Sequence, residues 1–314
     1  MKVCRLCLIL VVLDFFQLSL NAQLTYKELK VEYDSAWTYK NLQLVPVRFK
    51  ETRGRLASGQ NHLPALSLRE ALQKHKIKLQ EMQYEKGADI NWLQLTNHSK
   101  QNIIIQSGEI VAGGKQDRMI AETKIIAPGV TDYIHVFCVE KRRWDNKAKD
   151  FTSKGIADIE LRKVMDVKGR QNEVWKEIDR QFSAQKKTSN TWSYLNLYND
   201  SLRADTGYIN YFLKKYKESD STFAGYLFIT ADGIISCELF SSPDLTGIFF
   251  NNLVSSYVHF SILHGSTPSV TQDKIKDFMD KLLSNEQAQK TFIATRGRMH
   301  LFEGKVIHLV AFAN

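Results

Sequence analysis

The apolar positions of the chain form their densest pattern between residues 90 and 139. Short apolar runs recur there at Ile90–Leu95, Ile103–Ile105, Met119–Ile126 and Tyr133–Val139. Turn-forming residues separate these runs, namely Asn97-His98-Ser99, Gly113-Gly114 and Pro128-Gly129. Short apolar runs with such residues between them are typical of strands joined in antiparallel order. The stretch therefore predicts an antiparallel β meander, in a sandwich or in a half-covered sheet.

The segment before the meander contains two further strands and one helix. Asn41–Phe49 alternates between apolar and polar residues and predicts a strand, which Pro46 places at a sheet edge. Ser67 followed by Glu70 is typical of a capping box and predicts that a short helix begins there. Ile77–Tyr84 predicts a second strand.

After residue 144 the pattern changes to helical spacing and then to alternating strands and helices. Helices are predicted at 157–167, 173–182 and 206–218. Strands 223–230 and 234–240 flank an Ala-Asp-Gly turn, two helices follow at 242–263 and 271–284, and a hairpin closes the chain at 297–312. The whole pattern predicts an α+β fold with a β meander or sandwich first, a helical middle, and C-terminal β-hairpins packed with helices. We expect a β-rich part at 23–150 and a helical and α+β part at 151–314, with one continuous domain as the alternative.

Composition restricts the class of protein. A chain of 314 residues with 43% hydrophobic content can bury one large core or two moderate ones, which excludes general disorder. The formal net charge of +9 permits attraction to anions. Residues 141–187 carry 14 Lys or Arg against 8 Asp or Glu, but no aromatic-interleaved patch or nucleic-acid module accompanies them, which disfavours nucleic-acid binding.

The N-terminus is typical of a secretory signal peptide. Lys2 and Arg5 precede an apolar segment, and small or polar residues follow as far as Ala22. We expect residues 1–22 to be removed and the mature protein to be periplasmic or extracellular. The apolar segment is too short for a permanent membrane span. The mature chain keeps Cys138 and Cys237, either as one disulfide or as two buried thiols. The His and Cys spacings match no metal signature, so we predict no metal and no cofactor.

Two polar clusters lie within the predicted meander. They read Gly-Glu-x4-Gly-Lys-Gln-Asp-Arg at 108–118 and Cys-Val-Glu-x2-Arg-Trp at 138–144. A two-residue turn at Gly113-Gly114 would place Glu109 opposite Arg118, and a turn at Pro128-Gly129 would place Asp117 opposite Glu140. Even if each register slips by one or two residues, the clusters meet at one end of the sheet.

The clusters supply the candidate site residues. The candidates for catalysis are Glu109, Glu140 and Asp117, and the candidates for ligand binding are Lys115, Gln116, Arg118, Arg143 and Trp144. Neighbouring carboxylates suit acid–base chemistry, and cations with backbone N–H groups suit anions. The structural alternatives are a plain cross-strand ion pair between Glu109 and Arg118 and a core role for Trp144. The chain has no complete Walker motif and no nucleophile-elbow motif.

The two clusters, with Gln171-x2-Val174-Trp175 after them, resemble the ADP-ribosylglycohydrolase and rhodanese/phosphatase-superfamily-associated protein domain. The resemblance extends from about Asn41 to the last helices. Its motif positions are Gly108, Glu109, Gly114, Lys115, Gln116, Arg118, Cys138, Glu140, Arg143, Trp144 and Trp175, and Asp117 stands where Asn would also fit. The family has no established activity. The resemblance therefore implies where a site lies but not which reaction it performs, and only the family's name points toward nucleotide or phosphate chemistry.

Two function classes remain. In the first, the charged sheet end binds a small anionic or nucleotide-like ligand, or a protein partner. In the second, the protein is a hydrolase for phosphate- or ADP-ribose-like substrates, with Glu109 or Glu140 as base and Arg118, Arg143 and Lys115 stabilising the oxyanion.

We expect the mature protein to begin at or near Gln23, because the basic, apolar and small residues before it follow the order of a signal peptide. The intact mass of protein exported by an expressing cell measures this directly. Recovery of the full-length chain from Met1 in the cytoplasm would contradict it.

Overall fold

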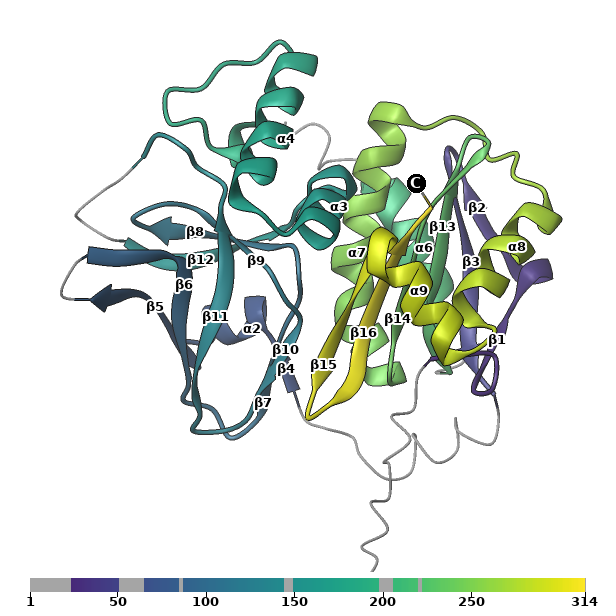
Figure 1. The fold of residues 1–314 in the computed structure, drawn as a ribbon, viewed down its shortest axis with the longest axis horizontal. Helices are drawn as coiled ribbons and strands as arrows, with labels where there is room; N and C mark the ends of the chain where they lie inside the picture. The colour runs from purple at the N-terminus through teal and green to yellow at the C-terminus, as the bar shows by residue number, and fades with distance from the viewer. Residues whose placement is uncertain are drawn as a thin grey trace, which may run out of the picture.

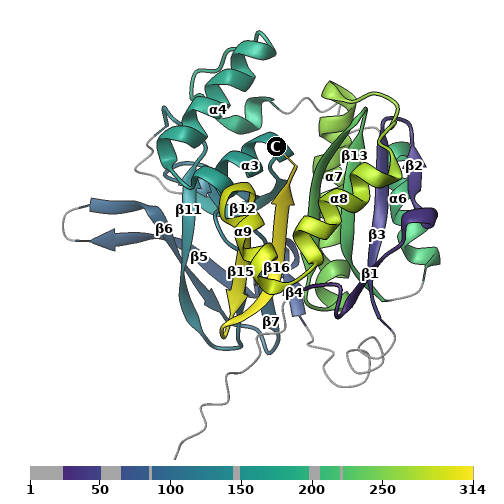
Figure 2. The same ribbon diagram turned by 45° about the vertical axis from the view of Figure 1, so that its right-hand side comes forward.

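The structure, a computed structural model, describes residues 24–50, 65–84, 87–143, 149–197, 206–219 and 222–313. These residues form two halves that lie side by side (Figure 1). One half is built mainly from β-strands and carries helices α3 and α4 at its top, and the other is a sheet with helices on both faces. In the turned view the C-terminal segment, in yellow, comes forward and overlaps the β-rich half (Figure 2). The predicted signal peptide lies outside the described residues.

We call the β-rich unit with α3 and α4 the first half, the sheet with helices on both faces the second half, and the boundary between them the seam. The second half contains a seven-stranded antiparallel sheet in the order β1-β3-β13-β14-β16-β15, with β2 also paired to β3. Its strands are β1 Leu29–Val31, β2 Trp37–Tyr39, β3 Leu42–Phe49, β13 Phe223–Thr230, β14 Gly233–Phe240, β15 Gly297–Phe302 and β16 Lys305–Phe312. Its helices are α6 Thr206–Glu218, α7 Pro243–His264, α8 Gln272–Leu283 and α9 Glu286–Arg296, and a 3-10 turn, η1, spans Tyr33–Ser35. The first strands of the chain therefore join this sheet through β3, which pairs with β13, a strand that begins only at Phe223.

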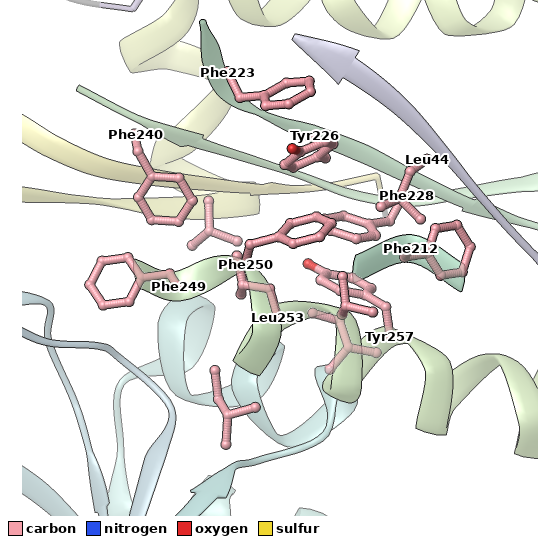
Figure 3. Packing of buried hydrophobic residues seen from close by; sticks show 14 of the residues in the cluster. Leu44, Phe212, Phe223, Tyr226, Phe228, Phe240, Phe249, Phe250, Leu253 and Tyr257 are labelled. Carbon is pink, nitrogen blue, oxygen red and sulfur yellow. The ribbon is translucent and has the colours of Figure 1, made fainter. Parts of the chain in front are cut away.

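Strand β13 explains why the sheet is covered on both faces. All eight of its residues are buried, as expected for a continuous apolar run in a central strand. Tyr226 and Phe228 pack toward α6 and α7, whereas Leu227 and Ile229 pack toward α8 and α9. Figure 3 shows the first of these cores, in which the rings of Phe228 and Tyr257 stack with centroids 3.5 Å apart.

The first half contains a six-stranded sheet in the order β12-β8-β9-β11-β6-β5 and a three-stranded sheet in the order β10-β7-β4. Their strands are β4 Ala65–Ser67, β5 Ile77–Tyr84, β6 Gly87–Asn97, β7 Asn102–Ile105, β8 Glu109–Gly114, β9 Arg118–Ile120, β10 Lys124–Ile126, β11 Thr131–Cys138 and β12 Lys149–Ile156. The helical elements of this half are α2 Leu68–Gln73, α3 Ile159–Lys168, α4 Gln171–Ala184 and the 3-10 turn η2 Tyr194–Leu197.

Two apolar clusters hold this half together. One fills the space between the two sheets, with Leu93, Ile103, Val111 and Ile134 among its members. The other packs α3 and α4 onto the end of the large sheet that carries β8, β9 and β11. The large sheet is thus covered by strands over one part and by helices over another, which leaves the helix-covered end beside the seam.

The predicted α+β fold is confirmed: antiparallel sheets dominate the first half, helices the middle, and hairpins with helices the end. The capping box at Ser67 and Glu70 is also present. Strand β12 and helix α9 were not foreseen. The edge position predicted for the strand containing Pro46 is wrong, because β3 has neighbours on both sides. Within β3, Pro46 lies between the residues that pair with β2 and the residues that pair with β1. The N–H that proline lacks is therefore not needed for pairing with either strand.

Cys138 and Cys237 are both buried free thiols. Cys138 ends β11 in the large sheet of the first half, and Cys237 lies on β14 in the other sheet. Of the two states that the sequence left open, the structure contains the pair of thiols.

Candidate functional site

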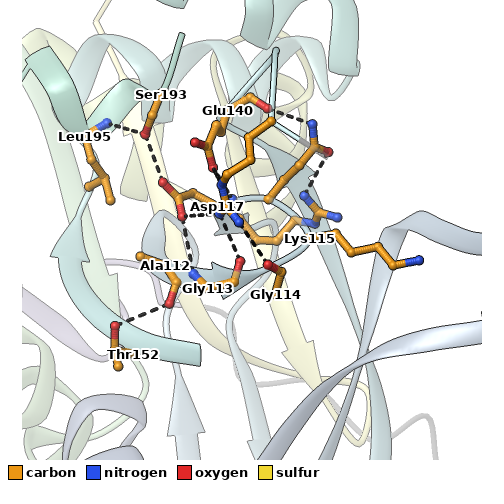
Figure 4. Close-up of polar contacts among 12 residues, drawn as sticks. Ala112, Gly113, Gly114, Lys115, Asp117, Glu140, Thr152, Ser193 and Leu195 are labelled. Carbon is orange, nitrogen blue, oxygen red and sulfur yellow. Dashed lines mark hydrogen bonds and ion pairs between the residues drawn. The ribbon is translucent and has the colours of Figure 1, made fainter. Parts of the chain in front are cut away.

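The two polar clusters meet at one end of the six-stranded sheet, and their residues form what we call the sheet-end cluster: Gln116, Asp117, Arg118, Glu140 and Arg143 (Figure 4). The predicted meeting is confirmed, although both predicted registers are wrong. Arg118 pairs with Val111 on one side and with Cys138 on the other. Glu109 therefore does not face Arg118.

The first register differs because β8 changes partners. Only Ile110 and Val111 pair with β9, whereas Ala112 and Gly114 pair with β12. Gly113 and Gly114 consequently end strand β8 and do not form a tight two-residue turn. Both glycines are required, since a Cβ on Gly113 would lie 2.5 Å from the carbonyl oxygen of Asp150, and Gly113 has a φ of +137°.

Arg143 holds the cluster together from its outer side. Its Nε donates to Glu140 Oε2 at 2.7 Å, and its Nη2 donates to Asp117 Oδ1 at 3.1 Å. The same guanidinium also donates to the carbonyl oxygens of Gly113 and Gly114. One shared guanidinium therefore bridges the two carboxylates.

Further hydrogen bonds hold the two carboxyl groups in place. Asp117 Oδ2 accepts a hydrogen bond from the hydroxyl of Ser193 at 2.9 Å. The backbone N–H of Asp117 donates to Glu140 Oε2 at 3.1 Å. Asp117 and Glu140 are both buried. A carboxyl group with such partners is well suited to fix the loop and has little capacity left for a ligand.

Arg118 is the most enclosed member, with no exposed side-chain surface. Its Nη2 lies 3.4 Å from Glu81 Oε1 on β5, and its Nη1 donates to Gln116 Oε1 at 3.2 Å. Glu81 also accepts the backbone N–H of Lys115. The ion-pair partner of Arg118 is thus Glu81, which the sequence did not single out because it lies in a different strand and outside both motifs.

The third motif segment joins the cluster through Gln171. Its side-chain carbonyl accepts the N–H of Cys138 at 2.7 Å, and its amide donates to the carbonyl of Cys138 at 2.9 Å. The carboxamide therefore hydrogen-bonds both backbone groups of Cys138 at the end of β11, as a neighbouring strand would. Lys115 is half-buried at the same place, and Trp144 lies outside the described residues.

Glu109 belongs to a different environment, at the seam between the two halves. Its Oε2 accepts the N–H of Gln106 at 2.8 Å, and its Oε1 lies 3.4 Å from Nδ2 of Asn252 on α7. Burial raises the pKa of the Glu109 carboxyl to about 7. A Cβ on its neighbour Gly108 would lie 2.9 Å from Cγ of Arg162, so the Gly-Glu pair is shaped to accept α3. The structure separates Glu109 from the other predicted site residues.

A buried ionic network occupies the seam beside Gly108. Arg162 Nη2 lies 2.6 Å from Glu238 Oε1, with neither side chain exposed. Glu238 also accepts Tyr257 Oη at 2.8 Å and His308 Nε2 at 2.7 Å. Burial would raise the pKa of Glu238, but Arg162 and His308 outweigh this effect and hold the pKa at about 2.

Thr123 connects this network to the β-rich half. Its hydroxyl lies 2.9 Å from His308 Nδ1, and its backbone N–H donates to His300 Nδ1 at 3.1 Å. The neutral ring of His300 must therefore carry its proton on Nε2, which lies 4.0 Å from Asp166 Oδ1. Burial raises the pKa of Asp166 to about 7, although Arg162 and Arg298 oppose the rise.

Sequence reasoning missed this network because its members come from five separate elements. One signal was present in the chain. Glu238 and His308 each interrupt a strand that is otherwise apolar, and a charged group inside such a strand requires a buried partner.

A large cavity also lies at the seam, and we call it the seam pocket. Its volume is about 680 Å³. Apolar and charged side chains from both halves line it, namely Ile159, Glu160, Lys163, Val164, Val167, Lys168, Glu177, Arg180, Asp232, Ile234, Ile235, Phe260, Arg296 and Phe312. None of the residues predicted as site residues from the sequence is among these.

Comparison with protein families assigns the chain. The model of the ARG and Rhodanese-Phosphatase-superfamily-associated Protein domain matches residues 30–312. The chain belongs to this family. Searches of curated proteins and of solved structures returned no match. The family domain thus includes both halves, the sheet-end cluster and the seam. Within the described part of the domain, no helix has the length and apolar character to cross a membrane, and no three His, Cys, Asp or Glu side chains are grouped as metal ligands.

We expect Arg118→Ala to destabilise the domain strongly. The substitution leaves the buried carboxylate of Glu81 without its cation, which costs about 3–5 kcal/mol of unfolding free energy. Urea unfolding curves measure it, with Lys281→Ala as the control, because Lys281 is exposed and its pair with Asp277 contributes about 0–1 kcal/mol. Equal, near-zero losses for the two variants would show that Arg118 is not structurally important.

We expect Asp166→Asn to alter how stability depends on pH. The raised pKa means that the folded state binds the Asp166 proton more tightly than the unfolded state does. This contribution to stability is present at low pH and is lost as pH rises from about 4 through about 7, at about 1.4 kcal/mol per pKa unit. Relative to the parent, the variant should gain about 3 kcal/mol between about pH 5 and pH 8.

Urea unfolding at the two pH values measures this gain, and Asp277→Asn at an exposed ion pair is the matched control. If Asp166→Asn and Asp277→Asn follow the parent equally at both pH values, the carboxyl of Asp166 does not titrate in this range in the folded state.

Proposed function

We propose that the protein binds a small amphipathic anion in the seam pocket. The supporting observation is the combination of cations and apolar surface in one cavity large enough for a ligand of drug size. The proposal keeps the small anionic ligand expected from the sequence and moves its site from the sheet end to the seam, because the sheet-end side chains are occupied with one another.

The charges in the pocket favour an anion. Arg180 is neutralised by Glu160 and Glu177, at 2.8 and 2.7 Å. Within the described residues, Lys163, Lys168 and Arg296 form no ion pair. Burial lowers the pKa of Lys163, and the neighbouring Arg296 and Lys168 lower it further. A bound anion would relieve this repulsion between cations.

The apolar side chains favour a ligand with a hydrophobic body. Ile159, Val164 and Val167 of α3 lie across the cavity from Phe260 of α7 and Phe312 of β16. The wall also includes Ile234 and Ile235, which follow the turn between β13 and β14. Burial of a flat or branched apolar group between these surfaces contributes affinity in proportion to the area covered. The cations then select for ligands that carry an acidic group.

A pair of matched probes tests the proposal. Anilinonaphthalene sulfonate carries the acidic group, and phenylnaphthylamine has the same rings without it. We expect the sulfonate to bind more tightly, as measured by fluorescence titration. Lys163→Met keeps the apolar stem and removes the charge, so the sulfonate should bind about tenfold more weakly, equal to about 1.4 kcal/mol, with little change for the neutral probe.

Two further variants make the result decisive. Val167→Phe fills the cavity and should weaken both probes, and the exposed Lys281→Met should weaken neither. Sulfonate binding that is unchanged by Lys163→Met and by Val167→Phe would overturn the proposal. A thermal-shift screen of anionic metabolites on the parent then identifies the natural ligand, since a ligand that binds the folded state raises its stability.

Hydrolysis of phosphate- or ADP-ribose-like substrates is the alternative proposal. It includes the connection with ADP-ribosylglycohydrolases that the sequence resemblance implies. One observation supports it. The pKa of about 7 for Glu109 suits a group that gains and loses protons near neutral pH. The cations that would assist Glu109 differ from those predicted, because Arg118 and Arg143 hold the sheet-end cluster.

A further inference from the structure

A second, smaller cavity lies on the seam next to Glu109, and we call it the Asn252 cavity. Its volume is about 270 Å³. Helix α2 contributes Arg69, strand β12 contributes Lys154, and helix α7 contributes Asn251, Asn252, Ser255 and His259. Polar side chains thus line much of this cavity, beside Ile156, Ile209 and Val258. It is large enough for a tetrahedral oxyanion with some of its water.

Arg69 gives the cavity an available cation. Its guanidinium lies close to Gly155, where a Cβ would stand 3.5 Å from Nη2. Among the described residues, Arg69 makes neither a hydrogen bond nor an ion pair, and its one marked electrostatic influence is on Glu109. Asp158, the carboxylate in the cavity wall, is engaged by the N–H of Leu161, by Gln181 and by Tyr194. The cavity thus presents positive charge with its carboxylate already satisfied.

Asn252 connects the cavity to Glu109. Its Nδ2 lies 3.4 Å from Glu109 Oε1, which is a long hydrogen bond, and the carboxyl of Glu109 is buried. The other oxygen of Glu109 accepts the N–H of Gln106. Burial raises the pKa of Glu109, and the N–H of Gln106, then the charge of Arg69, then Asn252 act against this rise. Arg69 is therefore the nearby charge that favours ionised Glu109.

We propose that the Asn252 cavity binds a tetrahedral oxyanion, such as the phosphoryl group of a small phosphate ester, between Arg69 and Lys154, and that binding places a proton from solvent on Glu109. The anion neutralises Arg69 and adds negative charge near the carboxylate. Both effects destabilise ionised Glu109, which takes up a proton while the anion stays bound. The result is an acidic group held beside a phosphoryl group.

Other titratable groups near Glu109 define the alternatives that an experiment must separate. His259 of α7 and Lys154 of β12 line the cavity, and Arg162 of α3 packs on the adjacent Gly108. Burial disfavours the charge of Arg162, but Glu238 outweighs this effect and raises the pKa of Arg162. His259 is the group that could take up the proton in place of Glu109.

Sulfate is the probe, because its charge is constant near neutral pH. Isothermal titration in two buffers of different ionisation enthalpy measures the protons taken up. If the bound anion raises the pKa of Glu109 by about one unit from about 7, about 0.4 proton enters per sulfate at pH 7, and affinity falls about fivefold from about pH 6 to pH 8.

Three variants assign the roles. Arg69→Met should weaken sulfate binding at least tenfold, whereas Arg170→Met, at an exposed arginine of the α3–α4 junction, should not. Asn251→Asp adds a carboxylate at an exposed position of the cavity and should weaken binding without affecting the fold. Glu109→Gln should keep sulfate binding and lose the proton uptake.

Two results would overturn the proposal. Sulfate binding that survives both Arg69→Met and Asn251→Asp would place the anion elsewhere. Proton uptake that persists in Glu109→Gln and disappears in His259→Gln would assign the proton to the histidine. Because none of these variants touches Lys163 or Val167, failure here is distinguishable from failure of ligand binding in the seam pocket.

Discussion

The buried ion pair between Arg162 and Glu238 is the interaction on which the relation between the two halves depends. Neither side chain is exposed, so removal of either would leave an uncompensated charge in the interior. Glu238 also accepts hydrogen bonds from Tyr257 of α7 and from His308 of β16, the strand that pairs with β14. Arg162 in turn packs against Gly108, and this contact explains why a residue without a Cβ precedes Glu109. The position of Glu109 is therefore a consequence of the ion pair.

The character of the seam differs from that of the two interiors. Ile104, Ile156 and Ile159 of the β-rich half extend one apolar cluster across the seam, and the polar side chains of Thr123, His300, His308 and Asp166 also meet there. Polar groups demand fixed hydrogen-bond geometry, so they pack less completely than aliphatic chains around the same space. The seam pocket and the Asn252 cavity both lie along this line, and each is lined by apolar and charged side chains together. The seam thus combines apolar packing, a buried ionic network and two cavities.

Local pattern was sufficient to predict most individual elements. The helix capped by Ser67, the strand run at 223–230 and the convergence of the two polar clusters all follow from neighbouring residues. The registers did not follow, because β8 leaves β9 to pair with β12, and β12 begins in a polar stretch with no clear alternation. Glu81 and Gln171 complete the sheet-end cluster from distant parts of the chain. Gln171 belongs to the third motif segment, whereas no motif or spacing in the sequence points to Glu81.

The order of strands in the seven-stranded sheet has a consequence for how the protein is made. Strands β1, β2 and β3 emerge first, but β3 pairs with β13, which begins only at Phe223. Contacts between residues so far apart in sequence slow folding, because the chain loses the entropy of closing a long loop before the contacts can stabilise it. During synthesis, the apolar strand β3 must remain without its main partner while the β-rich half folds. A cut chain that ends before Phe223 would display the edge of β3 to other molecules, so we regard interrupted synthesis as the condition under which this fold is most exposed to aggregation.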